Sequence, residues 1–251
     1  MKRFVLLIVA TILGFLSINS CQLNSNGQRN IQSYYYPMKV LEKGLVYEYT
    51  PVGNDSLTTE YWYYRTFEED SAYYFTGQYY DYRFNVQQFF TEEVVDNGTL
   101  MRNYFFYPTD STGKQVRYPA NIEVPNVFPF YITDTLGVFL YRISWRDYDN
   151  PAMTTTLVRN RRYKGDSEHH FNGKTYDCID FAVKELVETE LEGYQEIQYD
   201  GLERYAEGVG LVYYRKALSR DFVLEYELTG VYPMEDLEEK FGAFIQEHEN
   251  E

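Results

Sequence analysis

Residues 174–188 read KTYDCIDFAVKELVE and alternate apolar with small or polar side chains over most of their length. The apolar face carries Ile179, Phe181, Val183 and Val187. Successive side chains of a β-strand point to opposite faces, so a period of two predicts a strand that buries one face. Because such a strand must hydrogen-bond to neighbours, the rest of the chain is expected to supply more strands of the same kind.

Similar stretches, separated by turn signals, fill most of the chain. We expect further strands at residues 44–50, 59–67, 72–75, 79–87, 89–95, 99–107, 137–145, 154–163, 194–202, 211–218 and 222–232. Residues 96–98 (DNG) predict a hairpin turn, and residues 164–166 (KGD) predict another. Residues 118–129 are expected to form a long loop, because three prolines there cannot donate to a sheet. Residues 233–251 space apolar side chains as a short amphipathic helix does.

These elements predict a mainly β protein: a large curled antiparallel sheet or open half-barrel with a short C-terminal helix. Composition agrees, since 19% of residues are aromatic and 28 are tyrosine, which packs its ring while its hydroxyl reaches water. We divide the chain into a signal peptide (1–20), a polar tether (21–33), an antiparallel β domain (34–232) and a C-terminal helix or tail (233–251).

One motif lies in the last third of the chain. Residues 205–212 (YAEGVGLV), followed by residues 225–228 (EYEL), resemble the closing motif of a family of bacterial envelope proteins of unknown function. The resemblance implies a curled antiparallel sheet similar to that of the Lol-type lipoprotein carriers. Gly208 and Gly210 are expected to form a sharp turn into the final hairpin, because glycine accepts a positive φ.

The first residues, MKRFVLLIVATILGFLSINSC, indicate export. A basic end precedes an apolar run at 4–16 that is short for a membrane span but suits the core of a signal peptide. Residues 18–21 (INSC) resemble the lipobox of bacterial lipoproteins, in the loose form found in the Bacteroidota. The resemblance implies that Cys21 is acylated and anchors the protein in the outer membrane. Surface-exported lipoproteins of the Bacteroidota tend to carry an acidic run just after this cysteine. Residues 22–26 (QLNSN) lack one, so the resemblance implies a periplasm-facing rather than surface-exposed protein.

Net charge limits the possible partners of the protein, and its cysteine content limits its disulfides. The formal net charge of −15 becomes −17 without Lys2 and Arg3, and such a surface repels phosphate backbones, which argues against nucleic acid as a partner. There are two cysteines, and lipidation of Cys21 would leave Cys178 with no intrachain disulfide partner. We expect Cys178 to be a packed small side chain rather than a nucleophile.

The sequence carries no motif that identifies an enzyme. It has no P-loop, no H-E-x-x-H and no G-x-S-x-G, and residues 208–210 lack the third glycine of a dinucleotide fingerprint. His169 and His170 are expected in a solvated hairpin turn rather than in a zinc site, and residues 147–150 (DYDN) are too short for a calcium loop. We therefore predict no catalytic residue, no metal site and no cofactor.

Four Asp-Ser or Asp-Thr pairs resemble the O-glycosylation acceptor of the Bacteroidota. The resemblance implies possible modification of Ser56, Ser71, Ser111 and Thr135. Each residue lies in an expected turn. Asp-Ser and Asp-Thr are also common in turns because their side chains hydrogen-bond the local backbone, so both interpretations stay open.

Three classes of function remain. The first is a non-catalytic, lipid-anchored accessory subunit that binds a protein partner at the outer membrane. The second is a carrier that holds an acyl chain or other apolar ligand in a cavity of the curled sheet, and the third is a glycan-binding protein. Rings on both faces of the first half favour a partner-binding surface at Tyr61, Trp62, Tyr63 and Tyr79. A covering layer such as the C-terminal helix would bury those rings instead.

Overall fold

The computed structural model describes residues 27–54, 56–133 and 137–248, with side chains described as far as residue 242. Cys21, the signal peptide and Thr135 lie outside the described residues. The fold is mainly β with one α-helix near the C-terminus, as predicted. Nowhere in the described ranges is there a helix with the length and hydropathy needed to span a bilayer.

Every paired strand runs antiparallel to its neighbour. The elements in chain order are β1 (Arg29–Asn30), the 3-10 turns η1 (Gln32–Tyr34) and η2 (Val40–Lys43), β2 (Leu45–Pro51), β3 (Glu60–Glu69), β4 (Ala72–Tyr80), β5 (Val86–Val95), β6 (Gly98–Phe106), β7 (Tyr118–Pro119), β8 (Asn121–Pro129), β9 (Tyr131–Ile132), β10 (Val138–Arg146), β11 (Thr154–Phe171), β12 (Lys174–Glu190), β13 (Tyr194–Ala206), β14 (Gly210–Ala217), β15 (Val223–Tyr232) and α1 (Met234–His248).

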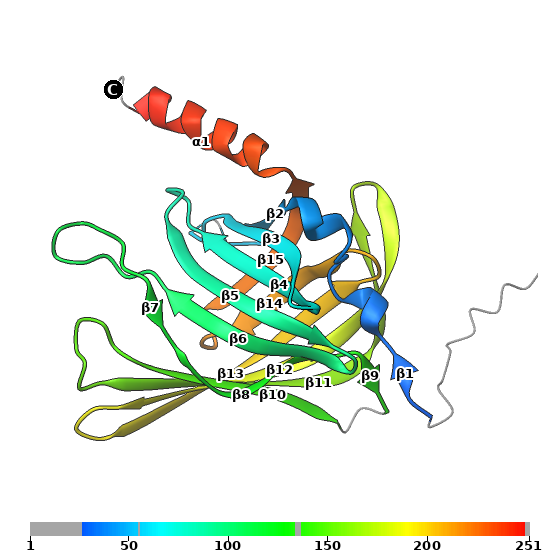
Figure 1. Ribbon diagram of the computed structural model, residues 1–251, viewed down its shortest axis with the longest axis horizontal. Helices are drawn as coiled ribbons and strands as arrows, with labels where there is room; N and C mark the ends of the chain where they lie inside the picture. Colours follow the sequence, from blue (N-terminus) through cyan, green and yellow to red (C-terminus); the bar gives the residue numbers. More distant parts are fainter. Residues whose placement is uncertain (1–26, 55, 134–136, 249–251) are drawn as a thin grey trace, which may run out of the picture.

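Twelve strands close into a barrel (Figure 1). Their order is β5-β4-β3-β2-β15-β14-β13-β12-β11-β10-β8-β6, and β6 pairs again with β5. The short strand β7 is the extra one, on the β6 edge that β8 leaves unpaired. The expected open half-barrel is therefore corrected to a closed barrel, because β8 bridges β10 and β6.

The predicted loop at residues 118–129 is wrong, since these residues form β7 and β8. Pro125 pairs in register with Tyr141, and Pro129 pairs with Gly98. Both ladders of β8 contain a register shift close to these prolines. Proline is tolerated in a sheet at such irregular positions, where a ladder hydrogen bond is already missing.

Two predicted boundaries are also wrong. Residues 81–85 form a turn between β4 and β5 rather than a strand, because the Asp81 carboxylate accepts the backbone N–H groups of Arg83 and Asn85 at 2.9 Å each. The expected turn at residues 164–166 is only an irregularity within β11, which continues to Phe171. The hairpin turn that follows it lies at residues 172–173.

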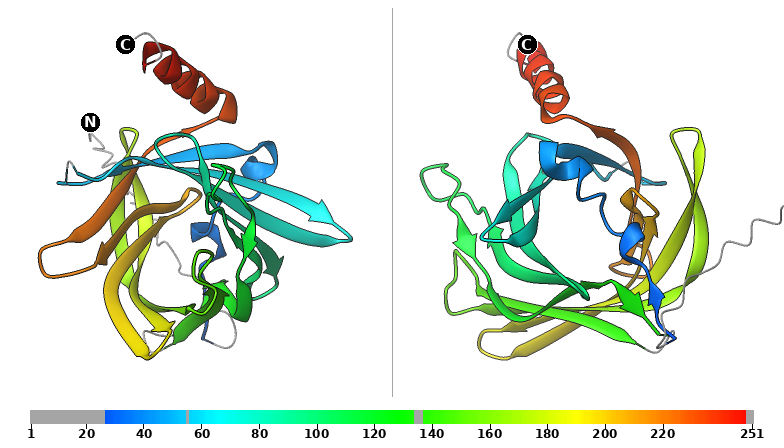
Figure 2. Two further views of the ribbon diagram at one scale, coloured as in Figure 1. Left: turned by 90° about the vertical axis from the view of Figure 1, so that its left-hand side faces the viewer. Right: turned by 45° about the vertical axis from the view of Figure 1, so that its right-hand side comes forward.

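The N-terminal segment lies at one end of the barrel (Figure 2). Ile31 and Tyr35 are buried, and the Ile31 N–H donates to the Phe130 carbonyl at 2.8 Å. Residues 29–33 thus belong to the packed structure, although the sequence placed them in a polar tether. The expected glycine turn is confirmed at β13–β14: Gly210 has φ +102°, and a Cβ there would lie 2.5 Å from the ring of Tyr36.

Helix α1 packs on the outside of the barrel, against β2 and β3. Leu237 and Phe241 are buried against Val46 and Tyr61, and the rings of Tyr61 and Phe241 meet edge to face at 5.4 Å. The amphipathic helix is therefore confirmed, and its apolar face covers part of the outer wall rather than the lumen.

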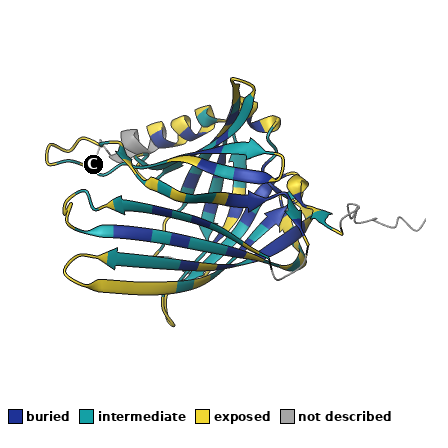
Figure 3. Ribbon diagram, turned by 60° about the horizontal axis from the view of Figure 1, so that its bottom comes forward, coloured by how far each residue is buried: buried dark blue, intermediate teal, exposed yellow. Residues whose placement is uncertain are grey.

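Buried residues concentrate at the end of the barrel where the N-terminal segment lies (Figure 3). This core is largely aromatic, and its buried rings are those of Tyr35, Tyr36, Tyr47, Tyr49, Tyr64, Phe75, Phe128, Phe130, Phe171, Phe181, Tyr205 and Tyr226. Edge-to-face and stacked contacts join many of them, for example Tyr36 on Phe75 at 4.7 Å. The core closes that end of the barrel and leaves the rest of the lumen for a cavity.

Candidate binding site

A cavity of about 550 Å³ occupies the lumen of the barrel beside the aromatic core. Its volume falls within the range of about 300–1,000 Å³ that small-molecule sites occupy. Much of its wall is aromatic, with rings from Trp62, Phe90, Tyr104, Phe106, Tyr141, Trp145, Tyr199 and Tyr214. These side chains come from strands far apart in the sequence, so the cavity exists only once the barrel closes.

The cavity reaches the surface at one end of the barrel. A second hollow shares Gln88, Phe106 and Trp145 with it and is more open to solvent. The remaining side chains of this mouth are those of Thr58, Tyr79, Asp81, Tyr82, Gln87, Tyr107, Pro108, Tyr118, Asp147 and Tyr148. The mouth therefore combines aromatic rings with carboxylates and amides, all at strand ends and turns.

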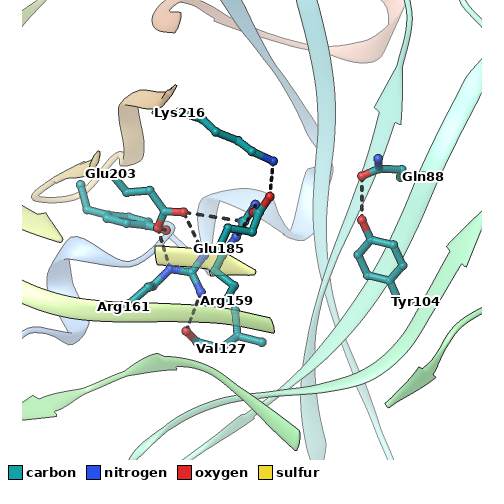
Figure 4. Close-up of polar contacts among 9 residues, drawn as sticks. Gln88, Tyr104, Val127, Arg159, Arg161, Glu185, Glu203 and Lys216 are labelled. Carbon is teal, nitrogen blue, oxygen red and sulfur yellow. Dashed lines mark hydrogen bonds and ion pairs between the residues drawn. The ribbon is translucent and has the colours of Figure 1, made fainter. Parts of the chain in front are cut away.

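One wall of the cavity carries a cluster of buried ion pairs (Figure 4). Arg159 on β11 stands directly opposite Glu185 on β12, and its Nε donates to Glu185 Oε2 at 2.9 Å. Arg161 donates from Nε and Nη2 to the two carboxylate oxygens of Glu203 at 2.6 and 3.2 Å, and from Nη1 to the Val127 carbonyl at 3.0 Å. Bidentate geometry of this kind makes the strongest side-chain hydrogen bonds.

Lys216 on β14 joins the cluster from two strands away. Its ammonium donates to Glu185 Oε1 and lies 4.5 Å from the centre of the Tyr199 ring. Gly201 stands between Lys216 and Val183 in the register of the sheet and has no side chain to obstruct the reach of the lysine. A Cβ at Gly201 would lie 2.5 Å from the Arg215 carbonyl oxygen, so the close approach of β13 and β14 also favours glycine at this position.

The cluster keeps its carboxylates ionised. Burial alone would raise the pKa of Glu185, but the charges of Arg159 and Lys216 outweigh burial and lower that pKa to about 2. Burial is outweighed in the same way at Glu203, whose pKa lies below its usual value because of Arg161 and Arg159. At neutral pH this wall therefore carries formal charges rather than neutral acids.

Other polar groups of the lumen pair with tyrosines. The Tyr104 hydroxyl donates to Gln88 Oε1 at 2.8 Å across the lumen from the cluster (Figure 4). The carboxyl of Glu60 accepts from the hydroxyl of Tyr214 and that of Glu92 from the hydroxyl of Tyr35. Burial raises the pKa of both carboxyls, which opposes their ionisation.

No family model and no curated protein matches this chain. Among solved structures, a candidate lipoprotein from Parabacteroides distasonis superposes with a TM-score of 0.50 at 13% identity, over 78% of this chain and 95% of that one. A candidate exported protein with a YmcC-like fold from Bacteroides fragilis gives a TM-score of 0.47 at 13% identity, over 76% and 95%. The likeness to the Parabacteroides protein shows a shared fold.

The aromatic residues predicted to bind a partner lie on both sides of the barrel wall. Tyr61 is buried under α1, with Tyr63 beside it on the same outer face. Trp62 faces the lumen and stacks on Tyr79 at 5.1 Å near the mouth. The structure therefore does not bring the four rings together on one surface, and partner binding stays a prediction.

The other singled-out residues do not line the cavity. Cys178 is buried, and burial raises the pKa of its thiol to about 11, so it is protonated at neutral pH. His169 and His170 are neighbours on β11 rather than in a turn, so their side chains point to opposite faces. In the part of the chain that the structure describes, no three metal-ligating side chains form a group.

Three of the four predicted acceptors of O-glycosylation are described. Ser56, Ser71 and Ser111 are exposed and lie in turns, as the sequence indicates. Their exposure is compatible with modification and equally with a role in the turns. Modification of these serines stays a prediction.

Sequence reasoning missed the ion-pair cluster. A signal for it exists, because Glu185 interrupts the apolar face that Phe181, Val183 and Val187 otherwise form. A charged residue at an inward position of an alternating strand needs a buried partner of opposite sign. That partner could not be named, since it depends on which strand lies alongside and in which register.

Proposed function

We propose that this protein binds a small amphipathic molecule in the lumen of its barrel, as a non-catalytic protein of the cell envelope. The observation that supports the proposal is the cavity itself, with aromatic walls and a wall of ion pairs at its side. Of the three classes left open by the sequence, the carrier is the one that needs such a cavity.

A purely apolar ligand fits this lumen less well than an amphipathic one. Removing an ion from water costs several kcal/mol in a protein, and the cluster recovers that energy only while its hydrogen bonds stay satisfied. An apolar molecule against the Arg159–Glu185 pair would displace water without replacing its hydrogen bonds. An amphipathic molecule places its polar atoms there and its apolar body against the rings of Tyr104 and Trp145.

The partner-binding class has less support. Tyr61 already packs against Phe241, and Trp62 contributes to the lumen, so both rings have contacts within this chain. A role as an accessory subunit at the outer membrane would use other surfaces, such as the mouth. The glycan-binding class would also use the mouth, where rings and carboxylates lie together.

The proposed binding site is tested by placing a large side chain in the lumen. Val187 lines the cavity, and Val187→Trp places an indole there, whereas Leu186→Trp puts the same indole on the outer face of the same strand. We expect the fluorescent neutral amphiphile N-phenyl-1-naphthylamine to bind the wild type and Leu186→Trp alike, and to bind Val187→Trp at least tenfold more weakly. Equal binding by all three proteins would contradict a site in the lumen.

We further propose that a lipid on Cys21 holds the protein at the outer membrane, with the barrel on the periplasmic side. The lipobox-like residues 18–21 support this proposal, and the Parabacteroides protein of the same fold is itself named as a candidate lipoprotein. Cells labelled with an alkyne analogue of palmitate should mark the wild type but not Cys21→Ala, and the variant should leave the membrane fraction. Labelling and membrane attachment that survive the substitution would contradict a lipid anchor at this residue.

A further inference from the structure

The ion-pair cluster of the lumen does not balance its charges. It contains the three cations Arg159, Arg161 and Lys216 but only the two carboxylates Glu185 and Glu203, both kept ionised by those cations. One positive charge is therefore left without a partner inside the cluster. A partly buried cation in excess favours an anion nearby, because charge interactions are screened less there than in bulk water.

All five side chains of the cluster line the cavity, but two of the cations are the most exposed of them. The side chains of Arg159 and Lys216 are 29% and 28% exposed, whereas those of Glu185, Glu203 and Arg161 are only 5%, 9% and 6% exposed. Both exposed cations line the cavity. A molecule that enters the lumen thus meets the N–H donors of Arg159 and Lys216 more readily than the largely covered carboxylates.

Hydrogen-bond donors also outnumber the acceptors they engage in the ion-pair cluster. The Lys216 ammonium has three N–H groups and engages one oxygen of Glu185. Arg159 uses Nε and Nη2 on the other oxygen of Glu185, and its Nη1 lies 3.6 Å from Glu203 Oε1. The two side chains converge on Glu185, Arg159 from the adjacent strand β11 and Lys216 from β14 two strands away, so their remaining N–H groups border the same part of the lumen.

The other acidic residues around the cavity do not remove this excess. Glu60 and Glu92 are held by the hydroxyls of Tyr214 and Tyr35, and burial opposes the ionisation of both. Asp200 also borders the cavity, but it is exposed and alternates along β13 with the inward positions of Tyr199 and Gly201, which directs its side chain to the outer side of the sheet.

We propose that Lys216 and Arg159 form an anion subsite that takes the single oxyanion group, such as a carboxylate, of an amphipathic ligand. This inference rests on the proposed function and deepens it by fixing the charge and orientation of the ligand. The oxyanion accepts charge-assisted hydrogen bonds from both cations, and the apolar body extends past Tyr104 toward Trp145 and the mouth.

A purely structural cluster makes a different prediction. If Lys216 only ties β14 to β12, its removal lowers stability and changes the binding of neutral and anionic molecules alike. If it binds an anion, removal selectively weakens the anionic one. Two fluorescent probes with the same aromatic body separate these cases: 1-anilinonaphthalene-8-sulfonate carries one sulfonate, and N-phenyl-1-naphthylamine carries none.

The experiment compares the dissociation constants of both probes on the wild type, Lys216→Met, Lys216→Arg and Lys184→Met. Lys184 is exposed on the outer face of β12, next to Glu185, and serves as the matched control. We expect the wild type to bind the sulfonate at least tenfold more tightly than the neutral probe. Lys216→Met should raise the dissociation constant of the sulfonate probe at least tenfold and that of the neutral probe less than twofold. Lys216→Arg should restore the preference for the sulfonate probe. Lys184→Met should change neither dissociation constant.

Several outcomes overturn the inference. Equal affinity of the wild type for the two probes would contradict the anion subsite but would still agree with a binding site in the lumen. An equal loss of affinity for both probes in Lys216→Met would show that the lysine has a structural role only. Failure of both probes to bind the wild type would overturn the subsite together with the proposed function. A melting curve of each variant identifies any that do not fold, and Lys216→Arg then decides the case because it preserves the charge.

Discussion

Glu185 shows how one residue organises a wall of the lumen. It stands on the inward face of β12, where it receives Arg159 from β11 and Lys216 from β14. Leaving one member of a buried ion pair without its partner destabilises proteins by about 3–5 kcal/mol, because the remaining charge stays desolvated. At Glu185 two cations would lose their partner at once.

Replacing Glu185 with glutamine should therefore destabilise the barrel in a pH-dependent way. The folded-state pKa of about 2 lies below the unfolded value of 4.5, so the carboxylate contributes stability that is fully present above pH 4.5 and is lost as the pH falls toward 2. The difference of roughly 2.5 pKa units corresponds to about 3 kcal/mol at pH 7. We expect wild type and Glu185→Gln to differ by this amount at pH 7 and by about 1 kcal/mol at pH 3.

Urea unfolding at the two pH values measures this difference, with Glu188→Gln as the control. Glu188 pairs with Arg142 at 3.4 Å on the outer face, where both side chains are more exposed, so its loss should cost less than about 1 kcal/mol. A Glu185→Gln penalty that equals that of the control, or that does not change with pH, would contradict the account of the cluster.

At the scale of elements, alternation predicted those strands whose inner face is mostly apolar. Strands β12 and β15 and helix α1 follow the expected pattern because one face of each packs against a core. The pattern failed at 79–87, where tyrosines and polar residues alternate but the side chain of Asp81 captures the backbone of a turn. It failed again at β8, because an irregular ladder accepts prolines that a regular one excludes.

The candidate site could not be predicted from the sequence for a related reason. All but one of its charged side chains lie within strands that were expected, and Glu203 falls one residue past the expected end of its strand at residue 202. Their meeting depends on register. Arg159 faces Glu185 only because β11 and β12 pair at that offset, and a shift of β11 by one residue would turn Arg159 to the outer face while Glu185 stayed inward. The cavity also requires β8 to close the barrel, and residues 121–129 were expected to be a loop.

At the scale of the molecule, the two ends of the barrel have different roles. The N-terminal segment and the aromatic core fill one end, where β1 pairs with β9 (Figure 1). The mouth lies at the other end, around Phe106 and Trp145. Strand β6 runs from one end to the other, since Gly98 pairs with Pro129 near β9 and Phe106 borders the mouth. The lumen thus opens away from the segment through which the chain enters the barrel.

The central claim is that this lumen holds an amphipathic anion, and a crystal structure of the complex with 1-anilinonaphthalene-8-sulfonate tests it most directly. We expect one probe molecule in the lumen, with sulfonate oxygens within hydrogen-bond distance of Lys216 Nζ and the Arg159 guanidinium and with its rings against Tyr104 and Trp145. A probe bound only on the outer surface, with water filling the lumen beside Lys216, would contradict the claim.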